Sequence, residues 1–255
     1  MDAGPEPRAP IAASDIESVR PAEAAEIAAA RDRIEERIEQ ACRRSRRDAA
    51  DVRMIAVSKA IPADRLRAAV SVGIDTFGEN RVQEAVDKVG LVPGAAWHLI
   101  GPLQSNKARR AIETFGTIQS VDSVGLASKL DRISGELRPG DRFPVLLQVN
   151  VDADPAKAGF APEEIAALLP EILELPNLQI EGLMTVGRLH HDSTEARTTF
   201  AGLRRLSGDL RARQAGLGPD LSMGMSDDFE IAVEEGATLV RIGRVLFGAR
   251  SVGAG

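Results

Sequence analysis

Lys59 is the residue of this chain best placed for covalent chemistry. It closes the segment Arg53-Met54-Ile55-Ala56-Val57-Ser58-Lys59, whose apolar run is typical of a buried strand. A lysine at a strand end is partly shielded from water, and desolvation of its amine favours the uncharged, nucleophilic form. Such an amine can form a Schiff base with the aldehyde of a substrate or cofactor. The alternative is an ordinary lysine that reaches from the strand end into water.

The elements that must position Lys59 alternate regularly along the chain. Eight apolar segments are predicted to be strands, at 53–58, 75–78, 96–100, 117–121, 144–151, 178–185, 220–223 and 238–242. Helical patterns lie between them at 62–72, 80–89, 104–114, 123–135, 162–174, 194–214 and 228–235, and a last short helix is expected after Phe247. This alternation over 255 residues predicts an α/β protein, a single (β/α)8 TIM-type barrel.

An open doubly wound sheet is the alternative fold. It would be favoured by a glycine-rich turn after the first strand, and this chain has Ser58-Lys59-Ala60-Ile61-Pro62 there. We therefore prefer the barrel.

An extra N-terminal helix precedes the first strand. Its apolar residues recur every three or four positions, which places them on one helical face: Ile27, Ala30, Ile34, Ile38 and Ala41. We expect this helix to act as a lid or cap on the barrel. Arginines at its end are expected to be solvated, because cations are favoured near a helix C-terminus: Arg43, Arg44, Arg46 and Arg47. Residues 1–20 are predicted to be a disordered extension, which leaves 21–255 as the barrel domain.

Composition narrows the classes of partner. The net charge is −6, from 38 acidic and 32 basic residues, so the chain has no global field for holding nucleic acid. No apolar run approaches the ~18 residues of a membrane span, and no signal-peptide pattern begins the chain. The single cysteine, Cys42, suits a reducing compartment. We expect a cytoplasmic protein that binds neither nucleic acid nor membranes.

The active sites of TIM-type barrels lie where the carboxyl ends of the strands meet. Ser226 and Gly243 follow the seventh and eighth predicted strands, where such barrels often bind phosphate. Ser226 can cap the next helix and offer its hydroxyl, and Gly243 lets the backbone approach a ligand closely. The alternative is that Ser226 only caps and Gly243 only turns.

Arg241 shares a strand face with Gly243, so it is expected inside the barrel. A buried arginine must be paired or hold a ligand. Beside the pyridine nitrogen of pyridoxal phosphate, it would keep that nitrogen unprotonated and weaken the ring as an electron sink. A salt bridge to Glu79 is the alternative.

Several of these motifs together resemble those of a known family. The chain resembles the YggS/PROSC family of pyridoxal phosphate homeostasis proteins, from about Ile27 to Arg250, in the following stretches: Ala56-Val57-Ser58-Lys59, Phe77-Gly78-Glu79-Asn80, Trp97-His98-Leu99-Ile100-Gly101-Pro102-Leu103-Gln104-Ser105-Asn106-Lys107, Gly182-Leu183-Met184-Thr185, Ser222-Met223-Gly224-Met225-Ser226-Asp227-Asp228 and Arg241-Ile242-Gly243.

The resemblance implies a barrel similar to the N-terminal domain of alanine racemase, with pyridoxal 5'-phosphate on Lys59. It places the phosphate on Ser226, Gly243 and the following residue, Arg244, and the ring nitrogen opposite Arg241. The remaining cofactor-binding residues it implies are Asn80, His98 and Met225. The family usually has Thr or Ser where this chain has Arg244, so a hydroxyl donor is lost and a cation is gained.

The resemblance also implies a role in cofactor homeostasis. Such a protein would bind, buffer and deliver pyridoxal phosphate to dependent apo-enzymes and affect amino-acid and keto-acid balance, as a monomer or weak dimer. The alternative is an amino-acid racemase with weak activity, which needs a proton acceptor on each face of the bound substrate. Lys59 could serve one face. Racemases use a tyrosine on the opposite face, and this chain has no tyrosine. His98 would have to take its place. A lysine aldolase without cofactor is a third class.

Two other candidates are weak. The adjacent residues His190-His191-Asp192 have a metal-binding composition, but neighbouring histidines point apart, so no metal site is expected. Lys157 lies in the loop after the fifth predicted strand, where it could attract a second anion.

Overall fold

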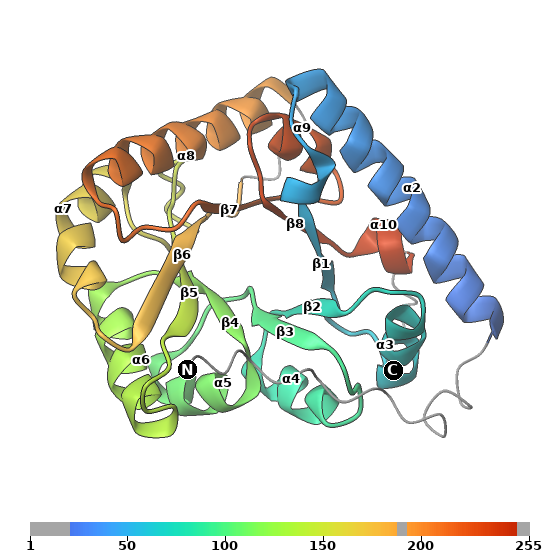
Figure 1. The fold of residues 1–255 in the computed structure, drawn as a ribbon, viewed down its shortest axis with the longest axis horizontal. Helices are drawn as coiled ribbons and strands as arrows, with labels where there is room; N and C mark the ends of the chain where they lie inside the picture. The colour runs from blue at the N-terminus through green and yellow to red at the C-terminus, as the bar shows by residue number, and fades with distance from the viewer. Residues whose placement is uncertain (1–20, 188–192, 249–255) are drawn as a thin grey trace, which may run out of the picture.

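Eight parallel strands form a closed barrel in which each strand pairs with its neighbours in sequence order and β8 pairs with β1 (Figure 1). The computed structural model describes residues 21–187 and 193–248. The predicted extension 1–20 and the triplet His190-His191-Asp192 lie outside these ranges. The predicted (β/α)8 barrel is confirmed. Its strands are β1 Arg53–Val57, β2 Thr76–Glu79, β3 Ala96–Leu99, β4 Thr117–Val121, β5 Phe143–Gln148, β6 Leu178–Met184, β7 Asp220–Met225 and β8 Leu239–Ile242.

Helices follow the strands and form the outer layer. They are α3 Ala63–Ser71, α4 Val82–Val89, α5 Ala108–Thr114, α6 Val124–Leu137, α7 Pro162–Leu173, α8 Ser193–Arg213 and α9 Phe229–Glu234, with short 3-10 turns η1 Ala49–Asp51 and η2 Ser105–Lys107. Over the described residues, none of the helices combines the length and the apolar character needed to cross a membrane.

A short helix that the sequence did not predict, α10 (Arg244–Phe247), follows β8. Its first turn closes on the Gly243 carbonyl, which accepts hydrogen bonds from the backbone N–H groups of Leu246 and Phe247. Gly248, with φ at 82°, ends the helix in a left-handed conformation. The helix expected after Phe247 would fall on residues beyond Gly248, which lie outside the described ranges.

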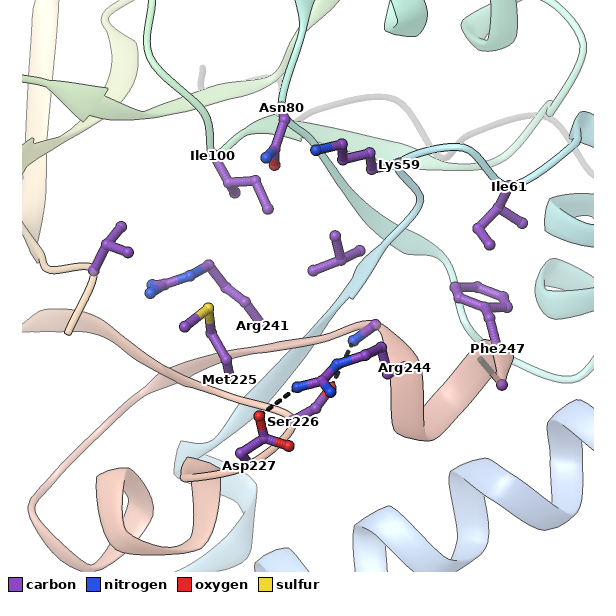
Figure 2. Close-up of a pocket in the computed structure, with 14 residues that line it drawn as sticks. Lys59, Ile61, Asn80, Ile100, Met225, Ser226, Asp227, Arg241, Arg244 and Phe247 are labelled. Atoms are coloured by element: carbon purple, nitrogen blue, oxygen red, sulfur yellow. Dashed lines mark hydrogen bonds and ion pairs between the residues drawn. The ribbon is translucent and has the colours of Figure 1, made fainter. Parts of the chain in front are cut away.

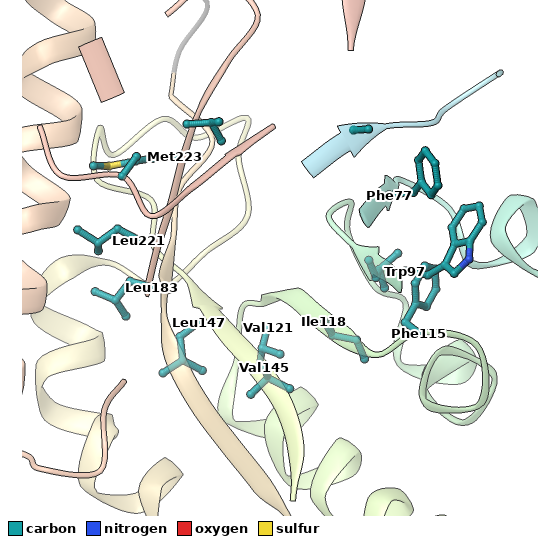
Figure 3. Packing of buried hydrophobic residues seen from close by; sticks show 14 of the residues in the cluster. Phe77, Trp97, Phe115, Ile118, Val121, Val145, Leu147, Leu183, Leu221 and Met223 are labelled. Atoms are coloured by element: carbon teal, nitrogen blue, oxygen red, sulfur yellow. The ribbon is translucent and has the colours of Figure 1, made fainter. Parts of the chain in front are cut away.

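Alternation along each strand separates two apolar layers. Phe77, Trp97, Ile118 and Leu147 point outward and pack beneath the helices (Figure 3). The rings of Phe77 and Trp97 lie 5.4 Å apart between centroids. A smaller inner cluster fills the barrel and consists of Ile55, Leu146, Met184 and Leu239. Because this cluster plugs the barrel, polar residues further along the same strands are left at the two ends.

The N-terminal helix α2 (Pro21–Ser45) lies in the outer layer and does not cover the rim (Figure 1). It packs against α3, α9 and α10, and it buries the apolar face predicted from its spacing. The expectation of a lid or cap is wrong for a physical reason. Since α10 has only four residues, it cannot cover the barrel beside β8 and β1, and the apolar stripe of α2 takes that place.

The basic end of α2 matches the prediction in part, since the side chains of Arg43 and Arg44 are 70% and 51% exposed. Arg44 forms an ion pair with Glu234 of α9 at 2.6 Å, and Arg47 donates a hydrogen bond to the Val233 carbonyl at 2.6 Å. These two arginines therefore also contact α9, which the sequence did not predict.

Truncation of Ile34 tests this role of α2. Ile34 is fully buried at the centre of the helix, so Ile34→Ala should lower the free energy of unfolding by about 2–5 kcal/mol. Leu91 is 54% exposed, and the control Leu91→Ala should change the free energy of unfolding by less than about 0.5 kcal/mol. Urea unfolding followed by circular dichroism measures both. Equal small effects would show that α2 is only loosely attached.

Candidate functional site

A cavity of about 290 Å³ opens at the carboxyl ends of the strands (Figure 2). This volume is near the small end of the range for small-molecule sites, roughly 300–1,000 Å³. Its apolar walls come from β1, the loops after β1, β3 and β6, and helix α10: Val57, Ile61, Ile100, Val186 and Phe247. Polar and charged side chains at separate points of the wall can orient a bound ligand.

Lys59 enters the cavity because it continues the inward-facing positions of β1, after Ile55 and Val57. Figure 2 shows its amine directed toward Asn80, which follows β2. Within the described residues, no hydrogen bond or ion pair of the amine is found. Gly101 fixes the backbone at Asn80, because a Cβ there would lie only 2.3 Å from the Asn80 carbonyl oxygen. The cavity therefore holds a primary amine without a partner beside an amide.

The loops after β7 and β8 meet on the other side of the cavity (Figure 2). The Ser226 hydroxyl accepts a hydrogen bond from the Gly243 backbone N–H at 3.3 Å, which ties the two loops together. Arg244 forms an ion pair with Asp227, and the two side chains are 60% and 64% exposed. A hydroxyl, a backbone N–H and a guanidinium therefore gather at one place, a set of groups suited to an anion.

Ser226 does not cap α9, as we expected from the sequence. Asp228 occupies the N-cap position of that helix, and its carboxylate accepts a hydrogen bond from the Met225 backbone N–H at 2.6 Å. The bond from Met225 to Asp228 closes the turn between β7 and α9. The Ser226 hydroxyl faces the β8 loop instead.

Arg241 lies inside the barrel with only 4% of its surface exposed. It donates hydrogen bonds to the Ser222 hydroxyl and to the Thr185 carbonyl, each at 2.7 Å. Burial lowers the pKa of its guanidinium to about 10, so Arg241 remains a cation at neutral pH. The alternative salt bridge to Glu79 is not formed, because Glu79 pairs with Lys88 at 2.7 Å.

A chain of hydrogen bonds continues from Arg241 across the barrel. The Ser222 hydroxyl donates to Gln119 Oε1 at 2.6 Å, and Gln119 Nε2 lies 2.8 Å from His98 Nδ1. The amide nitrogen of Gln119 can only donate a hydrogen bond, so His98 Nδ1 must accept it. Gln119 therefore donates to His98 Nδ1, and the neutral ring carries its proton on Nε2.

His98 does not line the rim cavity, where we expected it. It lines a second cavity of about 450 Å³ at the opposite end of the barrel, among residues that begin the first strands, such as Arg53 and Thr76. Burial lowers the pKa of His98 to about 4. The other predicted binding residues do line the rim cavity: Lys59, Asn80, Met225, Ser226, Arg241, Gly243 and Arg244.

Sequence reasoning missed three residues that support the site. Gln119 and Ser222 carry the hydrogen-bond chain, and Lys88 contacts the turn before Lys59. The available signal was weak. Gln119 is a polar residue inside the buried strand β4, and a buried amide needs partners.

Comparison with known proteins identifies the family. The model of the alanine racemase N-terminal domain matches residues 30–251. A pyridoxal phosphate homeostasis protein of Pseudomonas aeruginosa is 45% identical over 223 residues, which cover 86% of this chain and 93% of that protein. The chain belongs to the pyridoxal phosphate homeostasis protein family. A member from Escherichia coli is 36% identical over 230 residues, which cover 85% of this chain and 94% of that one.

Solved structures agree with this family assignment. PipY of Synechococcus elongatus, solved with pyridoxal phosphate bound, is 44% identical with a TM-score of 0.73, and the match covers 84% of this chain and 100% of PipY. Alanine racemase of Clostridium difficile has a TM-score of 0.66 at 17% identity, over 87% of this chain and 56% of the racemase. The racemase likeness shows the shared fold alone.

The low pKa of His98 gives this family member a pH-dependent stability. As pH falls below 6.5, the unfolded chain takes up the His98 proton before the folded protein, whose His98 titrates at about 4. The free energy of unfolding should therefore fall across that window, by at most about 3 kcal/mol. The control His98→Asn keeps an acceptor toward Gln119 without a titrating ring. Denaturant unfolding at several pH values should show a smaller loss in the variant; equal losses would contradict the buried, neutral ring.

Proposed function

We propose that this protein binds pyridoxal 5'-phosphate in the rim cavity and serves cofactor homeostasis, by binding, buffering and delivering it. One observation carries the proposal: the Lys59 amine, which has no hydrogen bond or ion pair to the described residues, shares a small cavity with an anion-binding group of residues and with the buried cation Arg241. These are the three kinds of group that an aldehyde, a phosphate and a pyridine nitrogen require. The residues present therefore fit the cofactor.

Each side chain has a role in this proposal. When bound, the cofactor supplies an aldehyde that can bond covalently to an amine, and Lys59 provides that amine. Ser226, Gly243 and Arg244 would hold the phosphate through a hydroxyl, a backbone N–H and a guanidinium. Arg241 would face the ring nitrogen and keep it unprotonated, because a fixed cation disfavours a second positive charge nearby.

Asn80 and Met225 would flank the ring, since both line the cavity. PipY, a relative solved with pyridoxal phosphate bound, supports binding of this cofactor in general.

A carrier is favoured over a racemase by the groups at hand. Racemisation needs an acid or base on each face of the bound amino acid. Lys59 offers one, whereas the chain contains no tyrosine and His98 lines the other cavity. The anion-binding group together with the buried Arg241 favours a bound phosphorylated ring over the substrate of an aldolase without cofactor.

The exposed phosphate end supports exchange of the cofactor. Because Arg244 and Asp227 are both more than half exposed, the phosphate could be reached from solvent while Lys59 holds the other end. We propose that the cofactor leaves by this side toward apo-enzymes in the cytoplasm, and that the protein acts as a monomer or weak dimer of one barrel domain.

Replacement of Lys59 tests the proposed attachment. The purified protein with pyridoxal 5'-phosphate should be yellow, and borohydride should fix the cofactor covalently to the peptide that contains Lys59. Lys59→Ala should lose both the colour and the fixed cofactor, because the amine is gone. The control Lys129→Ala on α6 should keep both. Absorbance and peptide mapping measure this, and a wild-type protein that stays colourless with added cofactor would overturn the proposal.

Arg244 should give the phosphate site its salt dependence. Arg244→Thr removes a cation, so affinity for pyridoxal 5'-phosphate should fall by a few-fold to about tenfold and depend less on salt. Asp227→Asn frees Arg244 from its ion pair and should raise the affinity. Absorbance titrations at several salt concentrations measure both variants. Unchanged salt dependence in Arg244→Thr would show that the guanidinium does not contact the phosphate.

A further inference from the structure

The turn that carries Lys59 is held from outside the cavity by the ammonium group of Lys88. Lys88 lies in α4, and its Nζ donates hydrogen bonds to the Ser58 carbonyl at 2.8 Å, to Glu79 Oε1 at 2.7 Å and to Glu84 Oε1 at 2.9 Å. The Lys88 side chain is 12% exposed and that of Glu79 is fully buried. All three donor positions of the ammonium are therefore used.

The second half of the turn is held by Glu84. Its Oε1 accepts a hydrogen bond from the Ala60 backbone N–H at 2.5 Å. Ala60 has φ at 61°, a left-handed conformation that costs a residue with a side chain roughly 1–2 kcal/mol. The bond to Glu84 offsets that cost and keeps the chain in this conformation.

Together these bonds fix the two peptide groups that flank Lys59. Lys88 holds the carbonyl of the peptide before it, and Glu84 holds the N–H of the peptide after it. Ser58 is fixed as well, because its hydroxyl donates to Glu79 Oε1 at 2.8 Å. With both peptide planes fixed, the direction of the Lys59 Cα–Cβ bond is fixed too.

The charges of Lys88, Glu79 and Glu84 compensate one another. Burial raises the pKa of Glu79, against hydrogen bonds from Lys88 and Ser58 that favour the carboxylate. One ammonium thus compensates carboxylates that would be costly to bury alone. None of the three charged residues lines the rim cavity, so Lys88 and Glu84 act on the backbone of the turn and not on a ligand.

We propose that Lys88 and Glu84 are positioning residues that aim the Lys59 amine at the cofactor aldehyde. This inference rests on the proposed function. In the step that they serve, the amine nitrogen adds to the aldehyde carbon and a C=N bond forms. Both amine protons leave with the carbonyl oxygen as one water molecule, and no oxidant or reductant is needed. A misplaced amine has a lower effective concentration at the aldehyde, so the covalent part of the affinity falls.

A comparison of two ligands distinguishes a role in positioning the Lys59 amine from a role in forming the cavity. Pyridoxal 5'-phosphate can bond to Lys59, whereas pyridoxine 5'-phosphate has an alcohol in place of the aldehyde and can only occupy the cavity. For Lys88→Met and Glu84→Ala, affinity for the aldehyde should fall at least about tenfold. Affinity for the alcohol should stay within about twofold of wild type. Absorbance titration and competition measure the two affinities in the full-length protein.

Matched variants sharpen the test. Glu84→Gln keeps an oxygen that can accept from Ala60, so it should retain most of the aldehyde affinity that Glu84→Ala loses. Lys129→Met, on α6, controls for the loss of a lysine and should change neither affinity. Glu84 is 26% exposed, so its variants should fold even if Lys88→Met, which strands a buried carboxylate, does not. Thermal unfolding of each variant checks this.

The outcomes are distinct. Equal losses for both ligands would mean that the group only supports the cavity, and unchanged affinities would mean that it does not position Lys59; either result overturns this inference. If the wild-type protein binds neither ligand, the proposed function itself fails. If it binds both equally and borohydride fixes nothing to Lys59, covalent attachment fails.

Discussion

Closure of eight parallel strands into one barrel is the constraint on which the rest of the structure depends. It brings every carboxyl strand end to the same rim, and the alternation of side chains sends every second residue inward. Ile55, Val57 and Lys59 follow one another on the inner face of β1, so one strand supplies part of the apolar plug, the cavity wall and the amine. A shift of one residue in register would turn all three outward.

A buried cation imposes the second requirement. Arg241 crosses the barrel interior, where a charge must be met by acceptors because water is excluded. Ser222 and the Thr185 carbonyl supply them. Satisfying Ser222 in turn requires Gln119, and satisfying Gln119 requires His98. The polar chain is therefore the consequence of placing one guanidinium under the rim cavity, and it connects the two ends of the barrel.

The two sides of the rim cavity are built differently. Around Lys59, the Lys88 ammonium and the Glu84 carboxylate fix the backbone through hydrogen bonds with the Ser58 carbonyl and the Ala60 N–H. Around Arg244, an exposed ion pair to Asp227 can open to solvent. Firm placement of the amine combined with an accessible anion site suits a protein that holds a phosphorylated aldehyde reversibly. This asymmetry comes from the fold, since α4 covers the first loop while the short α10 leaves the last loop open.

The sequence by itself determined the barrel, its strands and most of the residues at the rim. Periodicity within a segment reports which face is apolar, and the order of strands places Lys59 and its counterparts at one end. Only the tertiary structure decided which partners these residues have. Ser222 and Gln119 are 103 residues apart, and no local pattern encodes their contact or the resulting place of His98. Likewise, α2 became part of the outer layer because the other elements left one position there uncovered.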